Sequence, residues 1–156
     1  MNRKWRLYLD TSVFGGCFDA AEGWDGDSRR VVDYCAEGTA LLLSSETLEK
    51  ELKAAPKHVR KLYEDIADEH LEKIPLQEEI LRLANAYIAA GVVGSKWYED
   101  CLHVAFATVA RADAIVSWNF KHIVRLDRIR AFNAVNLGEG YGVMMIISPK
   151  EVNLYE

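Results

Sequence analysis

The chain has 156 residues, half of them hydrophobic, and a formal net charge of −5 at pH 7. A chain of this length and composition can bury one sizeable core, so we expect a single domain over residues 1–156. The negative charge argues against a protein that binds nucleic acid with its whole surface, because such affinity comes from cations that neutralise phosphates.

No apolar run is long enough to span a membrane, and Asp10 interrupts the apolar stretch that follows the basic N-terminal residues. We therefore expect a cytoplasmic protein with no membrane attachment. The cysteines are odd in number and form no C-x-x-C pair, which predicts free thiols and neither disulfides nor a structural zinc site. They are Cys17, Cys35 and Cys101.

The first half of the chain alternates strands with helices. Strands are predicted at 6–10, 39–44 and, shorter, at 71–74. Asp10 ends the first strand and opens a helix, since Asp, Thr and Ser favour caps. Further helices are predicted at 28–37, after a loop at 22–27, at 46–54 behind the cap Ser45, and at 56–69.

The second half is organised around residues 98–122. A helix bracketed by Pro75 and Gly91 comes first, with inward positions at Ile80, Leu81, Leu83, Ala84 and Tyr87. Residues 98–111 then predict a buried helix, and 114–116 predict a strand covered on both faces. A polar loop, a helix at 123–132 and a strand at 143–147 complete the prediction.

This alternation indicates an α/β sandwich with a largely parallel sheet. Right-handed crossovers place all strand ends on one rim, and in open sheets of this type ligands bind beyond the carboxyl ends of the strands. Asp10 and the residues Ser117, Trp118 and Asn119 fall at such ends. The topology therefore predicts a site there.

A carboxylate at the end of an apolar strand needs something to offset its lost hydration. Mg²⁺ and Mn²⁺ take oxygen ligands, so Asp10, Asp100 and an acid of the 46–54 helix are candidate ligands for one or two ions. For Asp10 or Asp100 taken alone, a helix cap is the favoured explanation. Together with Asn119 they favour a metal site.

The identity of the helical acid stays open on periodicity. Leu48, Leu52 and Ala55 mark the buried stripe, and Glu49 and Glu51 flank that stripe at similar angles.

Four segments together resemble the PIN-domain family of metal-dependent ribonucleases, in particular the toxins of VapBC-type toxin-antitoxin pairs. They are LYLDTSVFGG at 7–16, LLLSSETLEKEL at 41–52, DCLHVAFATVARADAIVSWNFKHI at 100–123 and VMMIISPKEV at 143–152. The resemblance covers nearly the whole chain. It implies a three-layer α/β/α sandwich.

The resemblance also implies roles for particular residues. Asp10, Glu51 and Asp100 match the family's metal-binding acids, with Glu51 preferred to Glu49, and Asn119 stands where many members have a fourth Asp. That departure leaves a second metal ion open. The hydroxyl positions that support the site match Thr11, Ser12 and Ser117.

The activity implied is hydrolysis of RNA phosphodiester bonds with Mg²⁺ or Mn²⁺. Residues 121–130 carry four Lys or Arg against one Asp, which is either a phosphate-steering patch or an ordinary solvated face. Candidate substrate contacts are His103, Trp118, Lys121, His122 and Arg125, with Arg128, Trp24 and Phe120 beside them. Core packing is the favoured alternative for the aromatic residues and is equally open for His103.

Partners implied by the resemblance are an RNA substrate, an antitoxin protein and a second copy of the chain in a homodimer. One alternative is a PIN-like domain that is catalytically weak or inactive and binds RNA or a partner protein, which Asn119 favours. Another is a phosphotransfer enzyme or receiver of the flavodoxin-like type, with Asp10 accepting phosphate. Ser12 counts against it, because the comparable phosphatases need a second acid at that position.

Overall fold

The fold is built on one five-stranded sheet. The structure, a computed structural model, describes residues 4–154, so the ends of the predicted domain at 1 and 156 lie outside it. The strands are β1 (Trp5–Leu9), β2 (Ala40–Ser44), β3 (Leu71–Lys73), β4 (Ala114–Val116) and β5 (Ile146–Ile147). Their order is β3-β2-β1-β4-β5, and every neighbouring pair is parallel. The predicted parallel sheet is confirmed.

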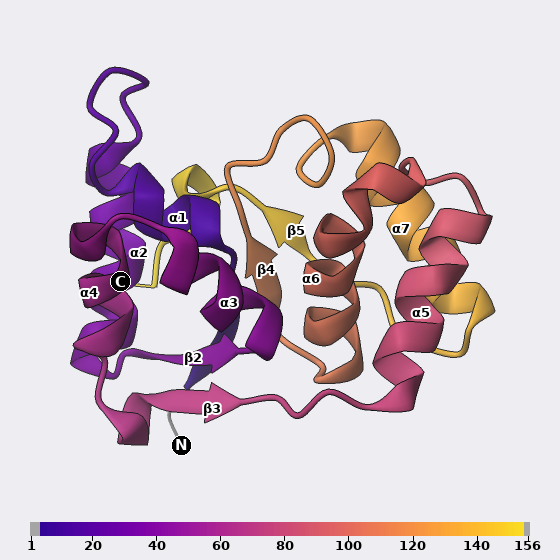
Figure 1. The fold of residues 1–156 in the computed structure, drawn as a ribbon, viewed down its shortest axis with the longest axis horizontal. Coiled ribbons are helices and arrows are strands. Elements are labelled where there is room, and N and C mark those ends of the chain that lie inside the picture. The colour runs from indigo at the N-terminus through magenta and orange to yellow at the C-terminus, as the bar shows by residue number, and fades with distance from the viewer. Residues whose placement is uncertain (1–3, 155–156) are drawn as a thin grey trace.

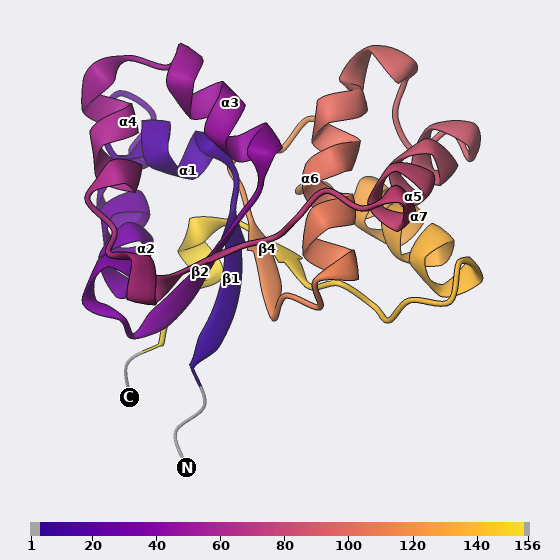
Figure 2. The same ribbon diagram turned by 60° about the horizontal axis from the view of Figure 1, so that its bottom comes forward.

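Helices cover both faces of the sheet (Figure 1). They are α1 (Thr11–Gly16), α2 (Asp25–Glu37), α3 (Glu46–Ala54), α4 (Lys57–Glu64), α5 (Glu78–Ala89), α6 (Tyr98–Val109) and α7 (Leu126–Gly138), with short 3-10 helices η1 (Asp68–His70), η2 (Ser95–Trp97) and η3 (Pro149–Glu151). Figure 2 shows α1–α4 on one side of the strands and α5–α7 on the other. The predicted three-layer α/β/α sandwich is confirmed. No helix within residues 4–154 combines the length and apolarity needed to cross a bilayer.

Alternation along the strands divides the interior into two cores. In β1, Leu7 and Leu9 point to the α1–α4 side, whereas Tyr8 points to the α5–α7 side. In β4, Val116 and Ile115 divide in the same way. Strands buried on both faces must be apolar throughout, which explains why the sequence of β4 is a continuous apolar run. The cysteines are free, as predicted, and they are buried in these cores.

The strand order determines where in the fold the candidate site lies. β1 is central, and the chain moves outward from it to β2 and β3 on one side and to β4 and β5 on the other. The crevice between β1 and β4 is therefore the topological switch point, where open α/β sheets bind ligands. This order differs from the flavodoxin-like order, in which β1 lies between β2 and β3.

Three predicted helices have different bounds. The helix predicted at 56–69 ends at Glu64, since Ile66 turns into the core before η1. The loop predicted at 22–27 is too long, because α2 already begins at Asp25, where acidic residues suit the first turn of a helix. The helix predicted at 123–132 runs over 126–138, because the Asn119 carbonyl accepts the N–H groups of Ile123 and Val124 and holds them in a turn.

Two further details were wrong. The last strand, predicted at 143–147, is reduced to Ile146–Ile147, because the side chain of Asn133 hydrogen-bonds both the N–H and the carbonyl of Met144. Leu81, predicted to face inward, is 37% exposed, whereas Ile80, Leu83, Ala84 and Tyr87 are buried as predicted.

Candidate functional site

Asp10 sits at the carboxyl end of β1 and caps α1. One carboxylate oxygen accepts hydrogen bonds from the N–H of Ser12 at 3.1 Å and from its hydroxyl at 2.5 Å, and the other accepts from the Ser117 hydroxyl at 2.6 Å. Asp10 is only 5% exposed. Burial raises the pKa of the Asp10 carboxyl, while the charge of His103 and the two serine hydroxyls oppose the rise. The serines thus orient both oxygens of a carboxylate that has lost most of its hydration.

Glu51 reaches the same place from α3. Ser45 caps this helix by accepting the N–H of Leu48 at 3.1 Å. The Oε1 atom of Glu51 accepts hydrogen bonds from the Thr11 hydroxyl and from His103 Nε2, the latter at 2.8 Å. Partial burial alone would raise the pKa of Glu51, but the hydrogen bond and charge of His103 outweigh it and lower that pKa.

The neighbouring acid on α3 faces elsewhere. Glu49 forms an ion pair with Lys73 of β3, with 3.3 Å between the charged atoms. Periodicity leaves Glu49 and Glu51 as alternatives. The structure separates them, because Glu51 is the acid that contacts Thr11 and His103 beside Asp10.

His103 is buried among these groups. Its Nδ1 lies 2.6 Å from the Tyr8 hydroxyl, which lies 2.7 Å from the Ser45 hydroxyl. Burial would lower the pKa of His103, but the hydrogen bond and charge of Glu51, with Asp10 and Asp100 nearby, raise it. A hydrogen-bonded chain from Ser45 through Tyr8 and His103 to Glu51 therefore braces the site, and the surrounding acids favour the protonated form of His103.

Tyr8 and Ser45 were missed as functional residues. Ser45 was identified only as a cap, and Tyr8 only as a strand residue. The available signal is the hydroxyl of Tyr8, which stands between Leu7 and Leu9 in the buried part of β1.

Asp100 and Asn119 complete the lining of the site. Asp100 lies in the first turn of α6, and its Oδ2 is 3.1 Å from His122 Nδ1. Burial raises the pKa of Asp100, while the charges of His103 and His122 oppose the rise. Asn119 accepts the N–H of His122 on its Oδ1 at 2.9 Å and donates its own N–H to the Ser117 hydroxyl at 2.9 Å. The loop after β4 is thereby folded against α6.

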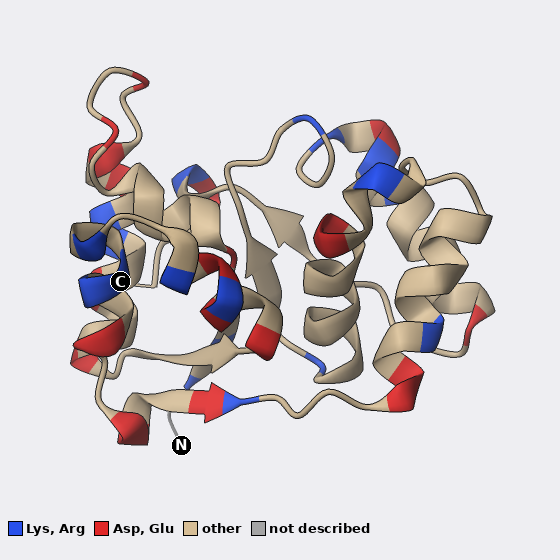
Figure 3. Cartoon of the chain, viewed as in Figure 1, with Lys and Arg blue, Asp and Glu red and all other residues tan. Residues whose placement is uncertain are grey.

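The structure brings the four predicted site residues together. Asp10, Glu51, Asp100 and Asn119 line one pocket of about 420 Å³, together with Thr11, Ser12, His103, Trp24 and Trp118. A second pocket, of about 480 Å³, shares Glu51, Asp100 and Asn119 with it. Acidic residues mark the start of α6 and parts of α3 in Figure 3, and basic residues mark the segment between β4 and α7.

The side-chain oxygens of the site are of the kind that hard cations bind, although they are spread around the pocket. Within residues 4–154, no three or more His, Cys, Asp or Glu side chains form a group that could hold a metal ion. Carboxylates and an amide carbonyl are nevertheless the oxygen ligands that Mg²⁺ and Mn²⁺ take, and these ions commonly keep water and phosphate oxygens as further ligands.

The aromatic residues predicted as substrate contacts mainly pack against one another. Trp118 is buried, stacks on Trp24 with 4.7 Å between ring centroids, and donates its indole N–H to the Ser28 hydroxyl at 2.8 Å. Gly16 makes room for this contact, since a Cβ there would lie 2.7 Å from the indole nitrogen. Phe120 is 44% exposed and meets both tryptophans edge-on. Trp24 and Trp118 contribute only part of their surfaces to the pocket wall.

The basic candidates are dispersed. Arg125 forms two hydrogen bonds with Asp127, at 2.6 and 2.7 Å, and Arg128 donates to the carbonyl of Val92. Lys121 is exposed, with its Nζ 5.7 Å from the centre of the Trp97 ring. Sequence reasoning missed Trp97 and its neighbour Lys96, which line the larger pocket, because neither belongs to a motif.

These contacts define a polar, predominantly acidic site at the switch point of the sheet. Comparison with protein-family models and with curated proteins finds no match for this chain.

Proposed function

We propose that this chain is a Mg²⁺- or Mn²⁺-dependent endoribonuclease. The observation that supports it best is the single pocket lined by Asp10, Glu51, Asp100 and Asn119, which come from four separate segments. A structural cap needs only its own helix, so caps alone do not require three acids from different elements to line one pocket. The resemblance to PIN-domain ribonucleases adds the reaction class.

The residues of the chain supply and orient oxygen donors. Ser12 and Ser117 fix both oxygens of Asp10, and Thr11 and His103 fix one oxygen of Glu51. A divalent cation held by these acids would polarise the scissile phosphoryl group and favour ionisation of an attacking water. His103 in its protonated form, which the acids favour by raising its pKa, would offset part of the repulsion among them.

We further propose that the protein is the toxin of a type II toxin-antitoxin pair, acts in the cytoplasm as a homodimer, and is silenced by an antitoxin segment that carries cations to the acidic pocket. This part rests on the family resemblance. Sedimentation velocity of the purified protein should show a dimer at high concentration. A strict monomer would count against the homodimer.

A second candidate function is binding of RNA or a partner protein without cleavage. The observation in its favour is that Asn119, which stands where many family members have an acid, already uses its Oδ1 to hold the His122 N–H. An Asn engaged in this way braces the loop and lowers the charge available for a cation.

Incubation with a mixture of structured and unstructured RNAs tests the proposal. Native protein should cleave with Mn²⁺ or Mg²⁺ and lose activity in chelator, and Asp100→Asn should be inactive in all conditions. Cleavage that chelator leaves unchanged would refute the metal requirement. Metal-independent RNA binding without any cleavage would favour the second candidate.

A further inference from the structure

The larger pocket has two walls of different character. Glu51, Asp100 and Asn119 form the wall shared with the acidic site. The remaining wall consists of Lys96, Trp97, Tyr98, Glu99 and His122. An aromatic ring and one lysine, Lys96, therefore stand directly beside the carboxylates, within one cavity of about 480 Å³.

Trp97 is the centre of this second wall. It lies in η2, immediately before α6, and remains partly exposed. Lys96 and Lys121 place their Nζ atoms 5.2 Å and 5.7 Å from the centre of its ring. The ring of His122 lies 4.1 Å away and is tilted by 33°, so the two rings are in contact.

The two lysines are available for an anionic ligand. Both side chains are exposed, and a cation over an aromatic ring is held only weakly in water. They come from opposite ends of the central stretch, one before α6 and one after β4, and converge on the same ring. Phosphate groups, which the acids would repel, would be attracted by the two lysines beside Trp97.

We propose that Trp97, Lys96 and Lys121 form a subsite for an unpaired nucleotide of RNA, here called the Trp97 subsite. The base stacks on Trp97 and the lysines contact the adjoining phosphates. His122 connects the subsite to the acidic site, because its Nδ1 is 3.1 Å from Asp100 Oδ2. The inference rests on the proposed function in so far as the ligand is RNA, and it specifies the substrate as single-stranded.

The preference for single strands follows from stacking. Every base has a face that an aromatic ring can cover, so the contact is tolerant of sequence. A base inside a duplex already stacks on its neighbours and cannot present that face unless it is splayed out. Trp97 should therefore contribute to the affinity for unpaired RNA and little to the affinity for a hairpin stem.

Binding measured in chelator, where the proposed nuclease is silent, tests the stacking contact. Fluorescence anisotropy with a short unstructured RNA should show about 5- to 150-fold weaker binding by Trp97→Ala. Binding of a hairpin should change little, and Trp97→Phe should recover most of the loss. Trp5→Ala is the matched control, because Trp5 is 49% exposed at the opposite end of β1.

Thermal melts of each variant separate recognition from packing, since Trp97 also packs against the core. Equal loss for unpaired RNA and hairpin, or a Trp97→Phe variant as weak as Trp97→Ala, would assign Trp97 to packing and overturn the subsite. Native protein that binds unpaired RNA no better than hairpin would also overturn it.

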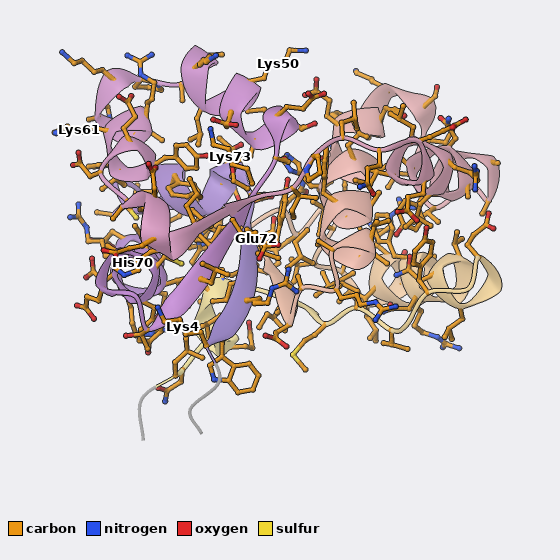
Figure 4. The ribbon with its side chains drawn as sticks, turned by 90° about the horizontal axis from the view of Figure 1, so that it is seen from below. Lys4, Lys50, Lys61, His70, Glu72 and Lys73 are labelled. Carbon is orange, nitrogen blue, oxygen red and sulfur yellow. The ribbon has the colours of Figure 1, made fainter. Side chains whose placement is uncertain are left out.

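The lysines have a test that leaves the aromatic ring intact. The double variant Lys96→Ser with Lys121→Ser should reduce the slope of log affinity against log salt by about 1.4 for unpaired RNA, since each phosphate contact on a single strand contributes about 0.7. The control is Lys4→Ser with Lys61→Ser, which removes the same charge ahead of β1 and on α4 (Figure 4). An equal change in both double variants would mean that only net charge matters and would overturn the contact.

Failure of this inference is distinguishable from failure of the proposed function. Metal-dependent cleavage by native protein with unchanged RNA binding by Trp97→Ala refutes the Trp97 subsite alone. Binding of unpaired RNA that depends on Trp97, with no cleavage in any metal, refutes the nuclease and keeps the subsite as part of an RNA-binding domain.

Discussion

Asp10 is a buried carboxylate, and its surroundings suit a bound cation better than they suit an unpaired charge. Its raised pKa means that the folded state binds the proton more tightly than the unfolded state. The associated stability is fully present below the ordinary value of 3.8 and is lost as the pH rises through the folded pKa. Ionisation of Asp10 in the absence of metal therefore lowers the free energy of unfolding.

We predict that Asp10→Asn and Asp100→Asn leave the melting temperature in chelator unchanged or raise it, while abolishing metal-dependent cleavage. Burial raises the pKa of both carboxyls, and a neutral amide removes the cost of burying charge. Thermal melts at neutral and acidic pH measure the effect, and any gain should vanish in acid. A marked loss of stability in both variants would identify the acids as structural caps.

Asn119 decides how much charge the pocket offers. We predict that Asn119→Asp strengthens metal binding and lowers the Mn²⁺ concentration needed for half-maximal cleavage, because a carboxylate replaces a neutral carbonyl oxygen. The choice of RNA should not change. Calorimetric titration of both proteins is the measurement, and weaker or unchanged affinity would mean that Asn119 only braces the loop through the His122 N–H.

At the scale of elements, α3 shows what local sequence can and cannot determine. Ser45 and the buried positions Leu48 and Leu52 place the helix, because a cap and an apolar stripe are local signals. They do not determine whether Glu49 or Glu51 enters the site. That depends on Lys73 of β3 drawing Glu49 away and on His103 of α6 meeting Glu51, and both are contacts between distant segments.

Ser45 also links α3 to the hydrogen-bonded chain that runs through Tyr8 and His103 to Glu51. We predict that Ser45→Ala lowers the free energy of unfolding by about 1–2 kcal/mol, because α3 loses its cap and Tyr8 loses a buried partner. Cleavage should fall as well, since Glu51 lies on α3. Chemical denaturation measures the free energy of unfolding. The control is Ser148→Ala, which removes the cap of η3: it should lower that free energy by about 1 kcal/mol and leave cleavage unchanged. Equal cleavage by both variants would contradict the bracing role.

At the scale of the whole molecule, the sequence predicts the class of fold better than its spatial order. Alternating strands and helices indicate a parallel sandwich, but the order β3-β2-β1-β4-β5 depends on which edge each crossover takes. The same limit explains the basic stretch at 121–130. Its residues are neighbours in sequence, yet Arg125 pairs with Asp127 and Arg128 binds the Val92 carbonyl, whereas Lys121 and His122 lie beside Trp97.

The central claim is that acids from separate elements form one metal-dependent catalytic pocket, and two acids of α3 test it most directly. Glu51 lines the pocket, whereas Glu49, two residues earlier, pairs with Lys73 outside it. With Mn²⁺ and unstructured RNA, Glu51→Gln should reduce the cleavage rate by at least about 100-fold, because even supporting partners of metal ligands contribute 10- to 100-fold. Glu49→Gln should cleave at the native rate. Native-like cleavage by Glu51→Gln, or equal loss in both variants, would contradict the account.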